Sequence, residues 1–478
     1  MIRLRPLLAS TLALAAAACA SGPNYVRPAT PTTAAGPFLS ANSPALDPGA
    51  QVQGDWWRLY RDPVLDRLVS DALAANTDVR VAIARLARAR ASLREVRGER
   101  APQLSVGAGA SYARAPLGQT APGASREDWS FDAGVSVAYE VDLFGRASRG
   151  VEAARGEVGA ADADLGAVRV LVAAETARAY ADAASAAERQ SVAEQIVALL
   201  DKSLALTEKR HSVGLATGLD VARIAALRDQ RRAEVPALLA ERQAALFRLA
   251  MLTGRTPAEL PPEAGARRET LRLDSPIPVG DGAALLARRP DVRAAERRLA
   301  ASTARIGVAT ADLYPRISLG GSFGSTAAKL GDLVTGGPVH WLVGSLLSWT
   351  VNRGPARARI AEAQADTQAA LATFDGTVLR ALQETETALS AYANLLDRRA
   401  ALASARDQAG RAAAITRARQ REGDVNSLDL LDAERTFADA QAAVAEADAR
   451  IADAQVDLFR ALGGGWQQPS PAGAPRAS

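Results

Sequence analysis

Few residues in this sequence have the types and spacing that enzyme chemistry requires. The 478 residues include a single cysteine, Cys19, and two histidines, His211 and His340, which lie far apart along the chain. No metal-ligand spacing, phosphate-binding loop or nucleophile motif occurs, and the glycines at 463–465 are typical of a helix stop. We therefore expect no enzyme activity, no metal and no cofactor other than a covalent lipid.

Cys19 is the residue for which the sequence predicts a chemical modification. Arg3 and Arg5 precede an apolar run, so residues 1–18 are predicted to be a secretory signal. A lone cysteine cannot form an internal disulfide, and at this position it resembles the acylated cysteine of a bacterial lipoprotein carrying palmitate. Ala16 stands where lipoproteins usually have leucine, so ordinary cleavage beside an incidental cysteine is the alternative. Ala20, rather than aspartate, favours sorting to the outer membrane.

The composition excludes several other classes of protein. Lys and Arg number 57 and Asp and Glu 53, without a basic block, so nucleic acid is not an expected partner. The sequence is 48% hydrophobic but only 4% aromatic, and its Ala-rich character favours helix. No mature segment is apolar and long enough for a transmembrane helix, so any membrane crossing must use strands.

The stretch from Trp129 to Gly145 alternates between two kinds of residue. From Phe131 to Leu143 the odd positions are apolar or aromatic and the even positions are polar or small. A period of two predicts a strand with different surroundings on its two faces. Its length exceeds the ~5–6 residues of an ordinary strand and suits a tilted membrane strand of about 9–11 residues. A long edge strand of a soluble sandwich is the alternative.

Long helical stretches flank the predicted strands. The first half should contain a helix over about 64–100 that breaks near Asn76, strands over 103–114 and 129–144, a helix over 146–211 and a return helix over 219–252 that Pro236 kinks. The second half should contain a helix, strands over 316–326 and 339–352, a helix over 355–421 and a return helix over 428–462. Each helix of sixty-odd residues would be ~100 Å long.

The order of elements indicates an internal duplication. Matched residues recur at a spacing of 213 before the strands and of 209 after them. These pairs are Asp78 and Asp291, Pro102 and Pro315, Gly145 and Gly354, Gly214 and Gly423, and Asp220 and Asp429. The predicted organisation is a signal (1–18), an extended lipid-anchored segment (19–54), repeat 1 (55–254), a linker (255–283), repeat 2 (284–466) and a disordered tail (467–478).

The expected fold class is mainly α with β, with four long antiparallel strands in each chain. Four strands cannot close a barrel, and open strand edges are not viable in lipid. A membrane protein of this kind therefore needs several copies, and three would supply twelve strands. Two short helices stacked end to end match the length of one long helix, which suits packing around a tube.

Short motifs along nearly the whole mature chain resemble the TolC-like outer-membrane factors, specifically the NodT-type lipoproteins of tripartite efflux systems. The motifs are GPNYVRP (22–28), WW and DP (56–57 and 62–63), DLFGR (142–146), RRPDVRAAE (288–296), IG (306–307), YPRISL (314–319), SLDLLDAER (427–435) and ALGGGW (461–466). The resemblance implies a homotrimer with a twelve-stranded barrel in the outer membrane and a helical tunnel in the periplasm. It also implies a periplasmic adaptor and an inner-membrane RND pump as partners.

The resemblance also implies which residues act at the periplasmic end. Leu428, Asp432 and Arg435 match the family's gate positions, where three copies of a side chain would form a ring around the axis. Arg435 could pair with Asp432 or with a neighbour's carboxylate. An ordinary helix start, with its carboxylates complementing the helix dipole, is the alternative. The adaptor-docking tip is predicted at the two matching turns, Gly214, Thr217, Gly218 and Gly423, Asn426, Ser427.

The leading hypothesis is thus a passive outer-membrane conduit for small molecules that a pump delivers through an adaptor. A type I secretion channel for proteins and a soluble periplasmic coiled-coil scaffold are the alternatives. Membrane-length strands bearing aromatic residues argue against the scaffold, which has no need of them. The exported substrate is not specified by the sequence.

Overall fold

The computed structural model describes residues 21–29, 32–50, 54–116, 125–273, 275–335 and 339–463. Cys19, the predicted signal and the predicted tail lie outside these ranges. The chain forms two compact units. The first comprises Met1–Pro28, Arg85–Asp162 and Ala294–Asp375, and the second comprises Ala29–Ala84, Ala163–Arg293 and Gly376–Ser478.

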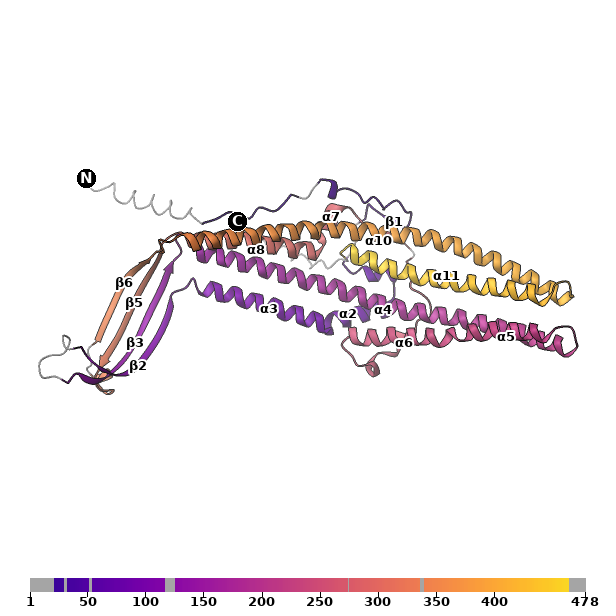
Figure 1. Ribbon diagram of the computed structural model, residues 1–478, viewed down its shortest axis with the longest axis horizontal. Coiled ribbons are helices and arrows are strands. Elements are labelled where there is room, and N and C mark those ends of the chain that lie inside the picture. Colours follow the sequence, from indigo (N-terminus) through magenta and orange to yellow (C-terminus); the bar gives the residue numbers. More distant parts are fainter. Residues whose placement is uncertain are drawn as a thin grey trace. The chain divides into compact units, whose positions relative to one another are not determined.

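The same succession of helices and long strands occurs twice (Figure 1). The first repeat contains α2 (Pro63–Ala75), α3 (Thr77–Gly98), β2 (Gln103–Arg114), β3 (Glu127–Val141), α4 (Arg146–Ser212), α5 (Gly218–Arg232) and α6 (Glu234–Leu252). The second contains α7 (Gly282–Arg288), α8 (Pro290–Ala311), β5 (Arg316–Ala327), α9 (Asp332–Thr335), β6 (Val339–Ser348), α10 (Gly354–Glu422) and α11 (Ser427–Ala461). The mainly helical fold with four long strands is thus confirmed.

The four long strands form one antiparallel sheet in the first unit, in the order β2-β3-β5-β6. β2 and β6 are the edges of this sheet, and every described residue of both is exposed. Figure 1 shows the strands side by side, joined pairwise into two hairpins. Each edge therefore leaves one side of its backbone without a partner strand in the single chain.

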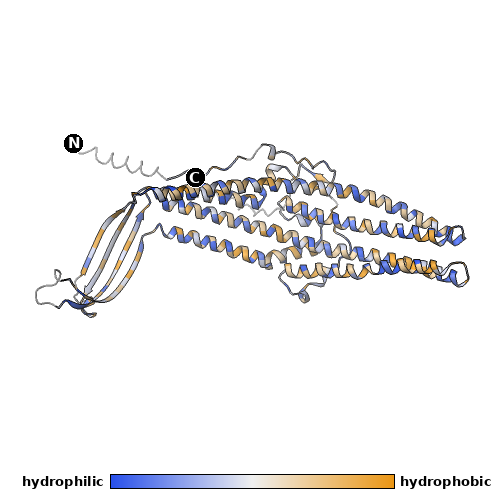
Figure 2. Ribbon diagram, viewed as in Figure 1, coloured by the Kyte–Doolittle hydropathy of each residue, from blue (hydrophilic) through white to orange (hydrophobic). Residues whose placement is uncertain are grey.

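The register places most of the apolar residues of the four strands on one face of the sheet. Directly paired residues share a face, and Val135 pairs with Val106 on one side and with Phe323 on the other. This face carries Leu104, Val106, Tyr112, Trp129, Val135, Val137, Leu319, Phe323, Trp341 and Val343. The opposite face carries serines, glycines and Asp132, with Leu342 and Leu346 as apolar exceptions. Figure 2 shows hydrophobic and hydrophilic residues mixed along each strand, as alternation requires.

Aromatic residues gather towards both ends of the strands. At the β2–β3 hairpin end, the rings of Tyr112 and Phe131 lie 5.6 and 5.8 Å from that of Trp129. Where the strands meet the helices, Phe144 stacks on Tyr314 with ring centroids 4.5 Å apart. Nearby, the indole of Trp349 donates to the carbonyl of Leu313 over 3.1 Å. Transmembrane strands characteristically carry such girdles at both interfaces.

The N-terminal segment is bound to the protein rather than merely extended. In the first unit the Ser21 amide donates to the Phe144 carbonyl over 3.0 Å. The buried Arg149 donates to the Ser21 carbonyl over 3.2 Å and to Asn24 Oδ1 over 2.6 Å. A Cβ on Gly22, whose φ is +82°, would lie 2.6 Å from Gly307 Cα, so this close approach requires glycine.

A second part of the expected tether packs into the core of the second unit. Phe38 and Leu46 are buried, and β1 (Leu46–Asp47) pairs in parallel with β4 (Ile277–Pro278) from the linker. The linker also forms 3₁₀ turns at Pro257–Glu259 and Pro262–Gly265. The apolar Phe38, Leu46 and Ile277 explain the difference, because their burial offsets the entropy lost on ordering these segments.

A cluster of aromatic and aliphatic residues forms the core of the second unit. Trp56 stacks on Phe459 of α11 at 4.5 Å between ring centroids. The buried Asp62 caps α2 and accepts from the Tyr180 hydroxyl and from Arg267, both at 3.0 Å. These contacts join the start of the folded chain to α4 and α11.

Several boundaries differ from those expected. β3 ends at Val141 because Asp142 turns back to cap α4, accepting from the Ala147 amide at 3.0 Å and the Ser148 amide at 2.8 Å. β6 ends at Ser348, before Trp349. The return helix expected over 219–252 is two helices that meet at Ala233, where the absence of an N–H at Pro236 interrupts the helical hydrogen bonds.

Candidate gate, docking tips and interhelical pocket

The turn between α4 and α5, here called the first tip (residues 213–219), is a compact helix stop followed by a capped start. Gly214 has a φ of +78°, and the Leu215 amide donates to the Arg210 carbonyl over 2.8 Å. Thr217 and Asp220 form a capping box, in which the Thr217 amide donates to Asp220 over 2.9 Å. The hydrogen bonds from the Thr217 amide and hydroxyl lower the pKa of Asp220.

The turn between α10 and α11, the second tip (residues 423–428), has the same construction. Gly423 has a φ of +82°, and the Asp424 amide donates to the Arg419 carbonyl over 3.0 Å. Asn426 Oδ1 caps α11 by accepting from the Asp429 amide over 2.8 Å. All six predicted docking positions lie in the two tips, with Gly218 and Ser427 as the first residues of α5 and α11.

Exposed apolar side chains on the first tip were missed by the sequence reasoning. Val213 is 66% exposed, Leu215 67% and Leu219 57%. Their proximity to Gly214 was the available signal, because apolar residues at a turn have no core to enter. They add an apolar component to the predicted docking surface.

The predicted gate residues lie on one face of α11. Leu428 is 51% exposed, and Asp432 and Arg435 are exposed one and two turns further on, while Leu430 is buried on the other face. Arg435 Nε lies 4.0 Å from Asp439 Oδ2, so in this chain its carboxylate neighbour is Asp439 rather than Asp432. The three side chains thus face away from the chain's own core, as a ring between copies requires.

Polar links hold the helices together behind this face. Arg231 of α5 is ion-paired with Asp439 of α11 and lies 3.0 Å from Glu234. Asp439 follows Asp432 by two helical turns, so the sequence spacing alone could have placed Asp439 on the same face of α11. Nothing in the sequence indicates that Arg231 reaches it. This pair joins the α4–α5 hairpin to the α10–α11 hairpin.

A buried ion pair lies deeper between α10 and α11. Arg417 Nε is 2.6 Å from Glu434, whose side chain is 1% exposed. Burial raises the pKa of Glu434, and the charge of Arg417 opposes this increase. Arg210 of α4 donates to the Gln420 carbonyl over 3.0 Å, so a hydrogen bond joins α4 to α10 one turn from Arg417.

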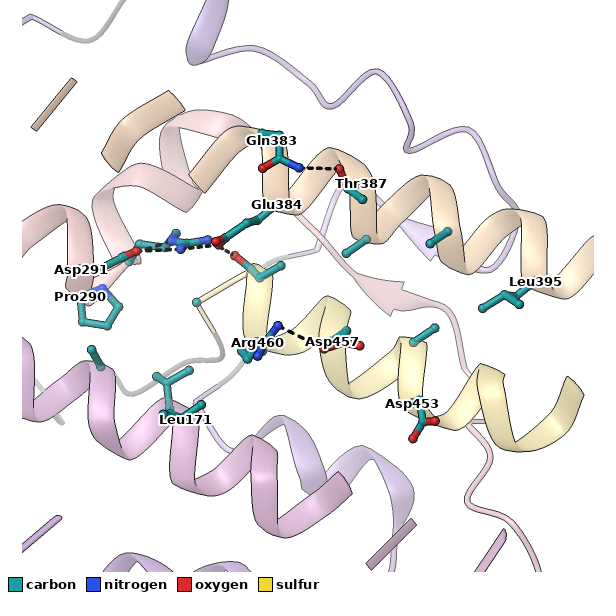
Figure 3. Close-up of a pocket in the computed structure, with 18 of the residues that line it drawn as sticks. Leu171, Pro290, Asp291, Gln383, Glu384, Thr387, Leu395, Asp453, Asp457 and Arg460 are labelled. Atoms are coloured by element: carbon teal, nitrogen blue, oxygen red, sulfur yellow. Dashed lines mark hydrogen bonds and ion pairs between the residues drawn. The ribbon is translucent and has the colours of Figure 1, made fainter. Parts of the chain in front are cut away.

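A pocket of about 790 Å³ opens between α4, α10 and α11 (Figure 3). Asp291 and Glu384 point towards each other from α8 and α10 (Figure 3). Both accept from Arg289, at 2.7 and 2.8 Å, and Arg289 also donates to the Ala461 carbonyl over 2.9 Å. Arg289 thus ties the end of α11 to α8 and α10. Its guanidinium group donates to three acceptors, so this cluster offers no free reactive group.

Two carboxyl groups meet beside this pocket. Burial and the proximity of Asp453 raise the pKa of Asp182 to about 7. Burial also raises the pKa of Asp453, against the lowering effect of its hydrogen bond with Asp182 and of the Arg178 charge. The two carboxyl groups thus bring α4 and α11 into contact.

The described residues hold neither metal-binding groups nor membrane-spanning helices. Across the described ranges no three His, Cys, Asp or Glu side chains are grouped to bind a metal ion. Likewise, none of the described helices combines the length and the apolar character needed to cross a bilayer.

Comparison with known proteins matches both repeats to one family. The family model described as "Outer membrane efflux protein" matches residues 68–255 and 283–464. The outer membrane protein OprJ of Pseudomonas aeruginosa is 34% identical over 462 residues, covering 96% of this chain and 95% of OprJ. The pyoverdine export outer membrane protein OpmQ of Pseudomonas putida is 30% identical over 476 residues, covering 98% and 99%.

Solved structures show the same fold. The outer-membrane channel OprN is 38% identical with a TM-score of 0.88, covering 94% of this chain and 100% of the OprN chain. The MtrE outer membrane channel of Neisseria gonorrhoeae, solved in its open state, is 28% identical with a TM-score of 0.79, covering 94% and 98%. The match extends through both repeats and both units.

Proposed function

This chain belongs to the outer membrane efflux protein family, and from that premise we propose that three copies of it form one export conduit. It is an outer-membrane channel component of an efflux system and not an enzyme. The observation that carries the proposal is the four-stranded sheet, which has one mainly apolar face and two open edges.

The sheet supports the threefold arrangement. Pairing the β6 edge of one copy with the β2 edge of the next satisfies the backbone groups that a single chain leaves open. Three sheets of four strands then close as a twelve-stranded barrel, with the face of Val135 and Phe323 towards lipid and the face of Ser136 towards the lumen.

The two tips support a partnership with other components. We infer that the first and second tips dock a periplasmic adaptor, which connects the conduit to an inner-membrane RND pump. The docking residues are Gly214, Thr217, Gly218, Gly423, Asn426 and Ser427. Exposed Val213, Leu215 and Leu219 offer the apolar area that a protein partner can bury.

Small molecules are the proposed cargo. OpmQ is named for pyoverdine export, and another relative, 29% identical over 463 residues, is the toluene efflux pump outer membrane protein TtgC of Pseudomonas putida. These names favour small-molecule efflux over the alternative of a type I secretion channel for proteins. The alternative of a soluble periplasmic scaffold is set aside, because the relatives are outer membrane proteins.

A gate and a lipid anchor complete the proposal. Three Leu428 side chains would form an apolar constriction and three Asp432 carboxylates an anionic ring, with Arg435 offsetting part of the charge. Cys19 is proposed to be acylated. The described chain begins two residues later at Ser21, bound to Phe144 at the end of the strands, where an acyl chain would reach the membrane.

Deletion and complementation in the native bacterium test this function. Loss of the gene should increase the cellular accumulation of dyes and antibiotics, and the wild-type gene should restore efflux. Native mass spectrometry of the purified protein should give three times the mass of one chain. Unchanged small-molecule accumulation together with the loss of a secreted protein from the medium would instead support type I secretion.

A further inference from the structure

Two leucines of β6, Leu342 and Leu346, lie on the polar face of the sheet. Leu342 pairs with Ser322 and Leu346 with Ser318. Because directly paired residues share a face, both leucines project on the side of Ser136, which itself pairs with Ser322. In the proposed barrel this side is the lumen, where transmembrane barrels are characteristically polar. The two leucines are therefore exceptions to the pattern of the sheet.

The leucines are not covered by their own chain. Leu342 is 62% exposed and Leu346 is 68% exposed. The strand beside them, β5, presents small residues on this face, namely Ser318, Gly320, Ser322 and Gly324. Arg316, the next residue of β5 on this face, donates to Asp312 over 2.6 Å and so turns towards the residue that follows α8. The leucines thus stand above a floor of glycine and serine, which cannot bury them.

A neighbouring copy of the chain cannot cover the leucines either. In the proposed trimer β6 pairs with β2 of the next copy. On the same face of the sheet β2 carries Gln103, Ser105, Gly107, Gly109, Ser111 and Ala113. Gln103, which has the one long side chain of this set, donates to the carbonyls of Gly98 and Ala101 over 2.9 and 3.0 Å and so turns towards the end of α3. Any register between the copies therefore leaves both leucines open to the lumen.

The two leucines, here called the lumen stripe, form a line along the wall of the barrel. They are four residues apart on one strand, with Gly344 between them, so their Cα atoms are roughly 13 Å apart. Glu140 lies in the row of Leu346, but Arg146 donates to its two carboxylate oxygens over 3.0 and 2.9 Å. A passing molecule thus meets apolar surface at the stripe rather than an unpaired carboxylate in that row.

We propose that the lumen stripe transiently binds the apolar part of the exported small molecules. Inside a closed barrel the contents of the lumen are the partners that remain for these side chains, and apolar surface that leaves water on contact favours binding. The stripe therefore selects amphiphilic cargo with aromatic or aliphatic groups over fully polar cargo. The inference rests on the proposed function, because the polar face encloses a lumen only in the assembled barrel.

Isothermal titration calorimetry of the protein in lipid nanodiscs tests the stripe, with tetraphenylphosphonium as the probe. Tetramethylphosphonium, which carries the same charge but no rings, is the comparison cation, and protein-free nanodiscs give the background from lipid. The wild type should bind tetraphenylphosphonium and should bind tetramethylphosphonium much more weakly. Equal affinity for the two cations would show that charge, and not the leucines, attracts the probe.

Three variants locate the binding on the stripe. Leu342→Ser with Leu346→Ser should lower tetraphenylphosphonium affinity about tenfold, because the apolar surface is lost. Leu342→Met with Leu346→Met should retain the affinity. Ser322→Leu, which places a further apolar side chain in the row of Leu342, should increase it. Equal affinity of the wild type, the serine variant and Ser322→Leu would overturn the proposal.

Native mass spectrometry of the same proteins separates this inference from the proposed function. Wild-type protein that fails to give a trimer would contradict the proposed function. A wild-type trimer that is lost in the serine variant would show that the leucines pack between copies, and would overturn this inference alone. Trimers of unchanged mass whose affinity follows the apolar surface at these positions are the expected result.

Discussion

Asp182 on α4 and Asp453 on α11 are joined by a hydrogen bond between their half-buried carboxyl groups. Two neighbouring carboxylates repel each other when both are ionised, so their proximity favours the state in which one of them is protonated. Protonation of one of the two carboxyl groups therefore favours the contact between α4 and α11.

The pH dependence of stability follows from this pair. The pKa of Asp182 is about 7 in the folded protein, above its ordinary value of 3.8. The folded state thus binds more protons than the unfolded state between about pH 4 and 7, and stability must fall as the pH rises through that range. We expect thermal unfolding of the wild type at a lower temperature at pH 8 than at pH 5, and a smaller difference for Asp182→Asn. Exposed Asp397 provides the control Asp397→Asn, and an unchanged pH difference in Asp182→Asn would contradict the raised pKa of Asp182.

Arginine substitutions along β3 test which face of the sheet meets lipid. Val135→Arg or Val137→Arg should lower the free energy of unfolding by ~2–4 kcal/mol if the residue lies near the membrane midplane, because the charge enters hydrocarbon. Ser136→Arg, on the face of Ser105 and Ser322, should cost much less. Urea unfolding of the protein in lipid vesicles measures both. Equal tolerance at 135 and 136 would place the sheet outside the bilayer.

Single-channel recording in planar bilayers tests the gate. The isolated protein should conduct poorly, because the proposed rings of Leu428 and Asp432 would narrow the tip. Asp432→Ala should weaken block by polyvalent cations, since it would remove the proposed anionic ring. Leu428→Ala combined with Arg435→Ala should increase conductance, and Asp429→Ala, in the capped first turn of α11, is the control. Wild-type conductance in the double variant, with cation block preserved in Asp432→Ala, would place the constriction elsewhere.

Mass spectrometry of the mature N-terminus tests the lipid. We expect an acylated Cys19 as the first residue. Cys19→Ser should weaken membrane anchoring without preventing trimer formation, because the sheet provides its own attachment to the membrane. A mature chain that begins at another residue and carries no acyl group would show that Cys19 is incidental.

Local sequence signals predicted the elements well and the contacts between them poorly. Gly214 and Gly423 marked the helix ends because a left-handed turn favours glycine wherever it occurs. The alternation from Phe131 to Leu143 predicted two faces for one strand, but the register that joins Val135 to Phe323 depends on how separate hairpins align. The pairing of Arg231 with Asp439 depends on how helices far apart in sequence pack, and no local pattern encodes it.

The two open edges of the sheet have a consequence for the life of the protein in the cell. A lone chain that entered the outer membrane would expose unpaired N–H and C=O groups along β2 and β6 to lipid, and a lone chain in the periplasm would expose its apolar face to water. Neither compartment offers an isolated copy a stable resting state. Synthesis in excess of assembly should therefore yield chains that chaperones hold and proteases remove, so that encounters between copies set the abundance of the conduit.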